Sequence, residues 1–255
     1  MYKDKVFRVR SEEEIIEDLE WARSAYGEVR KIFLADGDAL ILPFDTLVRI
    51  LEKINNLFPE CERVSIYATP QDVLRKTPEE LRTLFDLGLG MAYLGAESGS
   101  DTVLKNVKKG ASRNEIIEAI HKIEDAKIKA SVTFISGLGG KTLAEEHAVM
   151  TGSLISEATP SYVGLLTLLL DPSAPMYQDL RNGEFGLLNA EEIAIETLIL
   201  LENINATKEI IFRSNHASNY VPLSGTLPYN KKMMMLELQM ALDDGIFKDE
   251  VFRRL

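Results

Sequence analysis

The stretch "YLGAESGSDTVLKNVKKG", from Tyr93 to Gly110, decides the fold. It begins as a short apolar run, typical of a buried strand, and continues into a charged segment, typical of a helix that faces solvent. Glu97 stands between the two and is followed at once by Ser98. A carboxylate at the end of a buried strand marks that end as a candidate site.

The same succession of strand and helix recurs along the chain. Helix starts are predicted at Ser11, Thr77, Ser112 and Asn189, because each is followed three positions later by an acidic residue, the spacing of a capping box. Apolar runs between the helices are continuous rather than alternating, as in parallel strands buried on both faces. These runs are "KIFLA", "VSIYA", "AYLGA", "SVTFIS", "YVGLLTLLL" and "EIIFRS". The order predicts a parallel α/β sheet.

Two architectures have this order, a doubly wound open sheet and a barrel. Polar or glycine residues follow every predicted strand at its C-terminal end. In a barrel these ends converge on one rim, which favours a barrel here. The chain begins with a helix, so the barrel lacks its first strand. We expect a partial (β/α)6-type TIM-like barrel over residues 1–180, and a helix–strand–helix extension over residues 181–255 packed on it.

Composition excludes several classes of function. The chain has 255 residues, 45% of them hydrophobic, and a net charge of -11, which disfavours nucleic acid as a partner. The single cysteine, Cys61, cannot form a disulfide framework or a cysteine-based metal site, and fits a reducing, cytoplasmic setting. The longest apolar run is too short to span a membrane. The oligomeric state is open, since the edge left by the missing strand could pair with another chain.

Three motifs in order, "LADGDAL", "GAESGSDTVLKNVKKG" and "FISGLGG", resemble the radical S-adenosylmethionine superfamily, in its methylthiotransferase- and coproporphyrinogen-dehydrogenase-like branch. The resemblance covers about Tyr2 to Tyr177. It implies two cofactors, S-adenosylmethionine and a 4Fe–4S cluster, and a one-electron reductant as partner. The implied reaction is reductive cleavage of S-adenosylmethionine to a 5′-deoxyadenosyl radical, which abstracts hydrogen from a small-molecule or other substrate that the sequence does not identify.

One family motif is missing. The Cys-x3-Cys-x2-Cys loop that holds the cluster does not occur in this chain, and "MYKDKVFR" resembles the segment that follows its third cysteine. The chain therefore resembles a truncated reading frame, with the cluster ligands expected upstream of Met1 and no metal ligand within it. Cys61 cannot replace three cysteines. As it stands, the chain is expected to be inactive.

The resemblance implies contacts to the methionine end of the cofactor. Asp36, Gly37 and Asp38 would meet its amino group, and Lys109 would pair with its carboxylate. The alternatives are a turn capped by Asp and a cation at a helix end. Glu97 would accept both ribose hydroxyls, and Ser98 would lie beside it. Here the alternatives are a rim carboxylate paired with a Lys or Arg, and a serine that caps the next helix.

Further candidates follow the later strands. Ile135, Gly137 and Gly140 would shape the adenine site, or form no more than a tight strand-to-helix turn. Arg213, Asn215 and His216 are substrate-side candidates, with a buried, hydrogen-bonded histidine as the alternative. His121 and His147 are expected to face solvent from helices. The methionines near the C-terminus are expected to pack a helix: Met233, Met234, Met235 and Met240.

Two other functions remain open. One is a non-enzymatic nucleoside-binding remnant. The other is an ordinary βα-barrel lyase or aldolase that binds phosphate at the glycine turn, although "GLGGKT" lacks the spacing of a phosphate-binding loop.

Overall fold

The computed structural model describes residues 8–253, so the expectation for "MYKDKVFR" lies almost wholly outside the described residues. The described chain divides into two compact units. The N-terminal unit comprises the residues up to Leu94 together with Glu118–Ser131, and the C-terminal unit comprises Gly95–Ile117 together with the residues from Val132 onward. Each unit is described by itself.

Between residues 8 and 253, seven strands follow chain order in one sheet that does not close, β1 to β7. The pairs β1–β2, β2–β3 and β5–β6 are parallel, and β6–β7 is antiparallel. The strands are β1 (Lys31–Leu34), β2 (Arg63–Ala68), β3 (Leu89–Glu97), β4 (Lys129–Ser136), β5 (Tyr162–Thr167), β6 (Ile210–Ser214) and β7 (Leu223–Leu227). The α/β class and its TIM-like parallel strands are therefore as predicted.

The four helix starts that the sequence predicts are confirmed. Ser11, Thr77 and Asn189 each form a complete capping box, and Ser112 exchanges the same two hydrogen bonds with Glu115. The helices are α1 (Glu12–Ala25), α2 (Phe44–Leu57), α3 (Pro70–Arg75), α4 (Pro78–Asp86), α5 (Asp101–Asn106), α6 (Arg113–Asp125), α7 (Gly140–Ala158), α8 (Pro175–Asn182), α9 (Ala190–Glu202) and α10 (Lys231–Asp244). Two short 3-10 helices are η1 (Ala39–Ile41) and η2 (Glu250–Phe252).

Burial within the strands differs from the prediction. The strands were expected to be buried on both faces, but β3, β4 and β5 alternate between buried and half-buried positions. In the N-terminal unit the outer positions carry aromatic rings: Phe33 lies 4.6 Å from Tyr67 and 5.1 Å from Tyr93, centroid to centroid. Large apolar side chains on both faces made the runs look continuous, although one face keeps contact with water.

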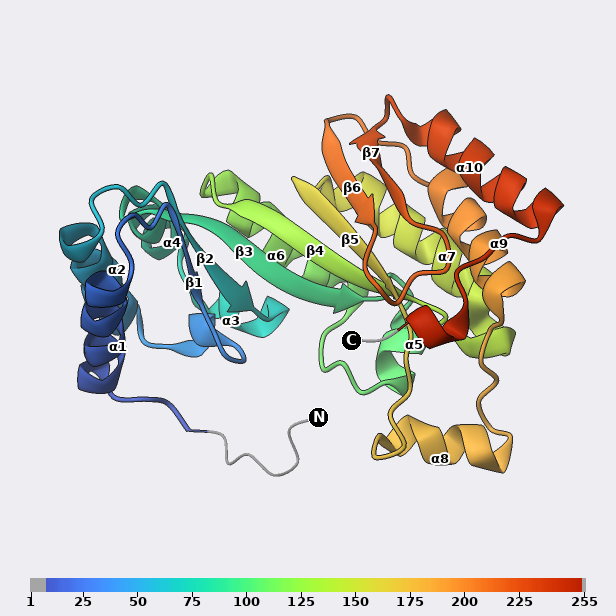
Figure 1. Cartoon of the computed structure of the whole chain (residues 1–255), viewed down its shortest axis with the longest axis horizontal. Coiled ribbons are helices and arrows are strands. Elements are labelled where there is room, and N and C mark those ends of the chain that lie inside the picture. Colours follow the sequence, from blue (N-terminus) through green and yellow to red (C-terminus); the bar gives the residue numbers. More distant parts are fainter. Residues whose placement is uncertain (1–7, 254–255) are drawn as a thin grey trace. The chain divides into compact units, whose positions relative to one another are not determined.

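Two strand boundaries in the C-terminal unit were not predicted. The run "YVGLLTLLL" leaves the strand at Thr167, three residues before its apolar part ends. Strand β7 was missed, because "LSGTL" is short and carries a glycine and half-exposed positions, as an edge strand can. Within this unit α8 stands apart from α7, α9 and α10, at the end of two extended connections (Figure 1).

Candidate functional site

Glu97, the last residue of β3, is held in an unusual position. Its φ is 67°, in the left-handed region that residues other than glycine seldom adopt. Its Oε1 lies 3.0 Å from Nζ of Lys109, and the two side chains are 23% and 18% exposed. A Cβ at Gly95 would lie 2.4 Å from Glu97 Oε1, so glycine is needed there for the carboxylate to fold back over the strand. The two expected cofactor contacts therefore pair with each other, which is the alternative considered for Glu97.

The turn after Glu97 is fixed to α7 by its polar groups. The hydroxyl of Ser98, which is fully buried, lies 2.8 Å from Nδ1 of His147. Nε2 of the same ring lies 3.0 Å from the carbonyl oxygen of Ile135 and so carries the proton, which leaves Nδ1 to accept from Ser98. Burial lowers the pKa of His147 to about 4, so the ring is neutral. His147 was expected to face solvent; that was wrong, because α7 turns this position toward the turn.

Gly99 and Ser100 belong to the same turn, and Gly99 also contacts α7. The Gly99 N–H donates to Oγ1 of Thr151 over 2.9 Å, and a Cβ at Gly99 would lie 2.3 Å from the carbonyl oxygen of Met150. Ser100, rather than Ser98, caps α5, since its side chain accepts from the Val103 N–H. The Ser-Gly-Ser sequence is therefore explained by close packing on α7, and Ser98 has little hydroxyl capacity left for a ligand.

The loop after β1 lies in the N-terminal unit. Gly37 has a φ of 68°, which glycine allows at little cost. Asp38 precedes η1, and its carboxyl faces Asp72, which also accepts from the Thr69 hydroxyl. Burial, then the hydrogen bond and charge of Asp72, raise the pKa of Asp38 to about 7. Asp38 is therefore partly protonated at neutral pH, and Asp36 lies beside Gly37 in the same loop.

Gly137, at the end of β4, lies beside a buried acid that the sequence analysis missed. Its N–H donates to Oε1 of Glu196 over 2.8 Å, and a Cβ on it would lie 2.9 Å from Cδ1 of Ile193. Burial raises the pKa of Glu196 to about 7. The signal was present in the sequence, because Glu196 shares helical spacing with the buried Ile193 and Leu200 on one face of α9.

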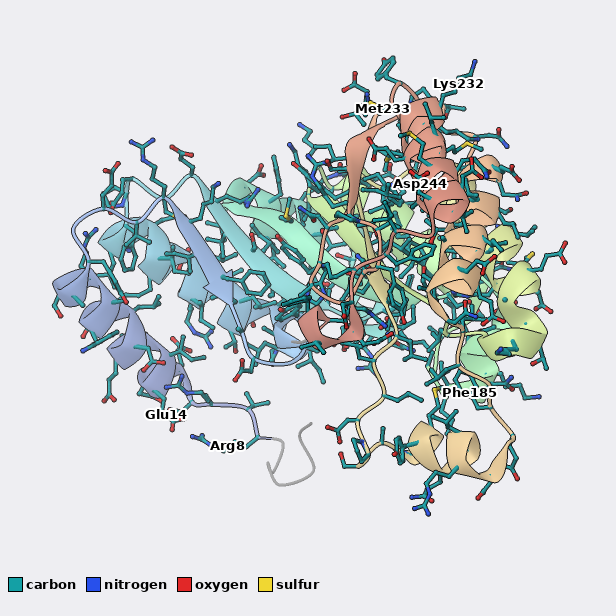
Figure 2. The ribbon with its side chains drawn as sticks, turned by 45° about the vertical axis from the view of Figure 1, so that its right-hand side comes forward. Arg8, Glu14, Phe185, Lys232, Met233 and Asp244 are labelled. Carbon is teal, nitrogen blue, oxygen red and sulfur yellow. The ribbon has the colours of Figure 1, made fainter. Side chains whose placement is uncertain are left out.

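Gly140 is the first residue of α7, and the segment around Phe185 packs against it. Its φ is 60°, and a Cβ on it would lie 2.7 Å from the ring of Phe185, on the connection that follows α8 (Figure 2). The N–H of Lys141 donates to the carbonyl oxygen of Gly186 over 3.0 Å. This part of the helix terminus is covered by the chain itself, which disfavours a phosphate at the glycine turn. Ile135 is half-buried.

The three substrate-side candidates lie at and after the end of β6. Arg213 is exposed, and its guanidinium donates to the carbonyl oxygens of Phe212 and Gly225, over 2.8 and 3.1 Å. Asn215 is exposed. His216 is half-buried, and its Nδ1 accepts from the Ser218 N–H over 3.2 Å, which matches the alternative of a hydrogen-bonded histidine.

A buried polar group near this turn was not predicted. The Thr167 hydroxyl donates to Oδ1 of Asn219 over 2.8 Å, and the Thr167 N–H donates to the Ser218 hydroxyl. Asn219 also donates to the carbonyl oxygen of Leu165. These contacts tie the end of β5 to the turn after β6, and no local sequence pattern marks them.

A 4Fe–4S cluster does not fit the residues of this chain. Such a cluster is held by three or four thiolates, and the chain has one cysteine. Cys61 is half-buried, and its thiol lies 3.5 Å from the carbonyl oxygen of Arg63. Between residues 8 and 253 no three His, Cys, Asp or Glu side chains are grouped so that they could hold a metal ion. The same part of the chain contains no helix that is long and apolar enough to cross a membrane.

Parallel strands in chain order, with acidic and glycine residues at the ends of β1, β3 and β4, define a TIM-barrel-like α/β protein. The family model described as the Radical SAM superfamily matches residues 2–151. The chain therefore belongs to the radical S-adenosylmethionine superfamily.

Relatives are similar over parts of the chain. The heme chaperone HemW of Bacillus subtilis is 21% identical over 198 residues, which is 76% of this chain and 51% of HemW. The human mitochondrial tRNA methylthiotransferase CDK5RAP1 is 31% identical over 113 residues, 42% of this chain and 18% of that protein. The structure of coproporphyrinogen III oxidase (HemN) from Escherichia coli, a radical SAM enzyme, superposes with a TM-score of 0.57 at 13% identity, covering 76% of this chain and 45% of HemN. The chain spans about half the length, or less, of these relatives.

Proposed function

We propose that this chain is the S-adenosylmethionine-binding core of a radical S-adenosylmethionine enzyme, and that Glu97 accepts the ribose hydroxyls. The observation that carries the proposal is the half-exposed carboxylate at the end of β3, held by a left-handed backbone and by the space over Gly95. A ribose diol offers two donors, and a carboxylate offers two acceptor oxygens. Membership in the superfamily supports this class of ligand.

Contacts to the methionine end of the cofactor are proposed within each unit separately. In the C-terminal unit Lys109, now paired with Glu97, has the charge for the carboxylate. In the N-terminal unit the loop of Asp36, Gly37 and Asp38 is proposed to bind the amino group. Because the pKa of Asp38 is raised to about 7, the acceptors in that loop are more readily the backbone carbonyls beside Gly37 than the Asp38 side chain.

The adenine ring is proposed to lie against Ile135 and Gly137. Ile135 is half-buried and can present apolar surface, and Gly137 lines a pocket. Gly140 supports this less well, since Phe185 fills the space where a ring would approach it. Ser98 is proposed to act indirectly, through the hydrogen bond to His147 that holds the turn after Glu97.

Chemistry at the cluster is not assigned to residues of this chain. One cysteine cannot hold three irons, so we propose that the cluster ligands are supplied from outside the 255 residues and that the chain alone does not cleave S-adenosylmethionine. The complete enzyme would need a one-electron reductant. A net charge of -11 favours a substrate other than nucleic acid.

Calorimetric titration with S-adenosylmethionine tests the proposal. Without a chelating iron, we expect weak binding, in the high micromolar range, since each 1.4 kcal/mol lost costs about tenfold in affinity. Glu97→Ala should abolish binding, and Lys109→Ala should reduce it less. If Glu97→Ala binds as well as the parent, Glu97 has a structural role and the proposal is wrong.

A non-enzymatic nucleoside-binding protein is the second candidate, and the single cysteine favours it. The two candidates differ in the ligand that they prefer. A core that serves the radical enzyme should bind S-adenosylmethionine more tightly than adenosine, because Lys109 contributes. A nucleoside-binding protein should bind both equally.

A further inference from the structure

The C-terminal unit contains a pocket of about 450 Å3 at the end of β5. It opens where the chain leaves the strand at Thr167, and it is bordered by α8, by the start of α9 and by η2. The volume lies in the range of small-molecule sites. Among the expected cofactor contacts, Gly137 also lines this pocket.

The walls of the pocket are mainly aliphatic. Leu187 is 37% exposed, and the other wall leucines are half-buried. Binding of an apolar ligand is favourable when the ligand covers apolar surface that water can otherwise reach. The leucines that line the pocket are Leu168, Leu169, Leu170, Leu180, Leu187 and Leu188.

The charged groups at one side of the pocket neutralise each other. Nη1 of Arg253 lies 2.7 Å from Oε1 of Glu250, and the Tyr220 hydroxyl donates to the same oxygen. Nε of Arg253 donates to the carbonyl oxygen of Ser218 over 2.6 Å, and the guanidinium lies 3.6 Å above the Tyr220 ring. The Arg253 side chain is 4% exposed. The cation is therefore balanced and well coordinated without a ligand.

The polar groups of Thr167 are satisfied as well. Its hydroxyl donates to Asn219 and its N–H donates to Ser218, so neither requires a partner from the pocket. A ligand here would gain mainly from apolar burial. An anion would have to displace Glu250 from Arg253, in a chain whose net charge is -11.

We propose that this pocket binds an uncharged apolar group and that it is the substrate pocket of the protein. Its role as a substrate pocket rests on the proposed function, because Gly137 at the end of β4 belongs both to the pocket and to the proposed adenine site. The binding of an apolar group does not depend on S-adenosylmethionine. The run "LLL" at Leu168–Leu170, which looked like the end of a strand, forms one wall.

Fluorescence titration with Nile red, an uncharged apolar dye, tests the site. The parent should bind one dye per chain with a blue-shifted emission. Leu187→Glu places a charge on the wall at a position that is already partly exposed, and should weaken binding by about tenfold or more. Ile195→Glu is the matched control, because Ile195 is 43% exposed on α9 and does not line the pocket. Equal dye binding by the parent and Leu187→Glu would overturn the proposal.

Competition distinguishes the ligand class. 1-Octanol should displace Nile red from the parent, and Arg253→Gln should not change the weaker effect of octanoate. If octanoate displaces the dye better than octanol does, and loses that advantage in Arg253→Gln, the pocket takes an anion and the proposed class is wrong. Titration with S-adenosylmethionine separates the two proposals. If Leu187→Glu still binds the cofactor but no longer binds the dye, the pocket is supported. If the parent binds the dye but not the cofactor, the proposed function alone is refuted.

Discussion

Glu196 is a buried carboxyl whose protonation should change the stability of the C-terminal unit. Burial raises its pKa to about 7, from an ordinary value of 4.5, and Oε2 has no hydrogen-bond partner among the described residues. Between these two values the folded state binds more protons than the unfolded state. The free energy of unfolding that depends on Glu196 is therefore largest below pH 4.5, falls as the pH rises and levels off above pH 7.

Glu196→Gln should remove this dependence. The difference between the two pKa values, 4.5 and about 7, corresponds to at most about 3.4 kcal/mol, so the variant should be more stable than the parent at pH 8 by up to that amount. Urea unfolding of both proteins from pH 4 to pH 8 checks this. The difference between the two curves is the relevant quantity, because the lowered pKa of His147, about 4, makes stability rise with pH over part of the same range. A constant difference across the range would contradict the assignment.

Several residues of the candidate site could be read from the sequence, and others could not. Glu97 was identified from its place at the strand end, and an ion pair with a lysine or arginine was the alternative considered for it; the observed partner, Lys109, lies only 12 residues further along the chain. His147, Glu196 and Asn219 were not identified as site residues, since their partners are Ser98, Gly137 and Thr167, 49 to 59 residues away in the chain. Hydrogen bonds over such separations leave no local pattern.

At the scale of elements, the contact between the turn after β3 and α7 depends on Gly99. A Cβ there would lie 2.3 Å from the backbone oxygen of Met150. Moving the backbone of a helix to relieve this clash would cost stability. Gly99→Ala should lower the free energy of unfolding by about 1–3 kcal/mol. Chemical denaturation measures it. Gly27→Ala is the control, because nothing lies within 4 Å of a Cβ at that position, and it should leave stability unchanged or raised by about 0.4–1 kcal/mol.

A Gly99→Ala protein as stable as the Gly27→Ala control would show that the turn can move away from α7. The Ser98–His147 and Gly99–Thr151 hydrogen bonds would then not fix the position of Glu97.

The elements themselves were largely predictable. Capping residues such as Ser11 and Thr77 act on the N–H groups next to them, so their effect is visible in the sequence. Six strands were predicted from their apolar runs, because such a run is also a local feature of the sequence. The end of β5 and the whole of β7 were missed, because Leu168–Leu170 line a pocket rather than continue a strand, and β7 is an edge strand with little apolar pattern.

At the scale of the molecule, the chain should hold no 4Fe–4S cluster. Anaerobic reconstitution with iron and sulfide, followed by gel filtration, should leave no stoichiometric cluster absorbance, since one thiol cannot supply the ligands. Cys61→Ser should behave like the parent. A stable, stoichiometric cluster in the parent would mean that other side chains ligate iron. That would contradict the structure, in which no three His, Cys, Asp or Glu side chains between residues 8 and 253 are grouped to hold a metal ion.

The central claim is that Glu97 accepts the ribose hydroxyls. Measuring the affinity of two nucleosides, with and without the hydroxyls, for the parent and two variants tests it most directly. Adenosine and 2′,3′-dideoxyadenosine, which lacks both hydroxyls, would be titrated into the parent, Glu97→Gln and Lys109→Met. The parent and Lys109→Met should prefer adenosine by about tenfold or more, as a charge-assisted hydrogen bond of about 1.5–3 kcal/mol requires. Glu97→Gln should lose most of that preference. An equal preference for adenosine in the parent and in Glu97→Gln would contradict the account.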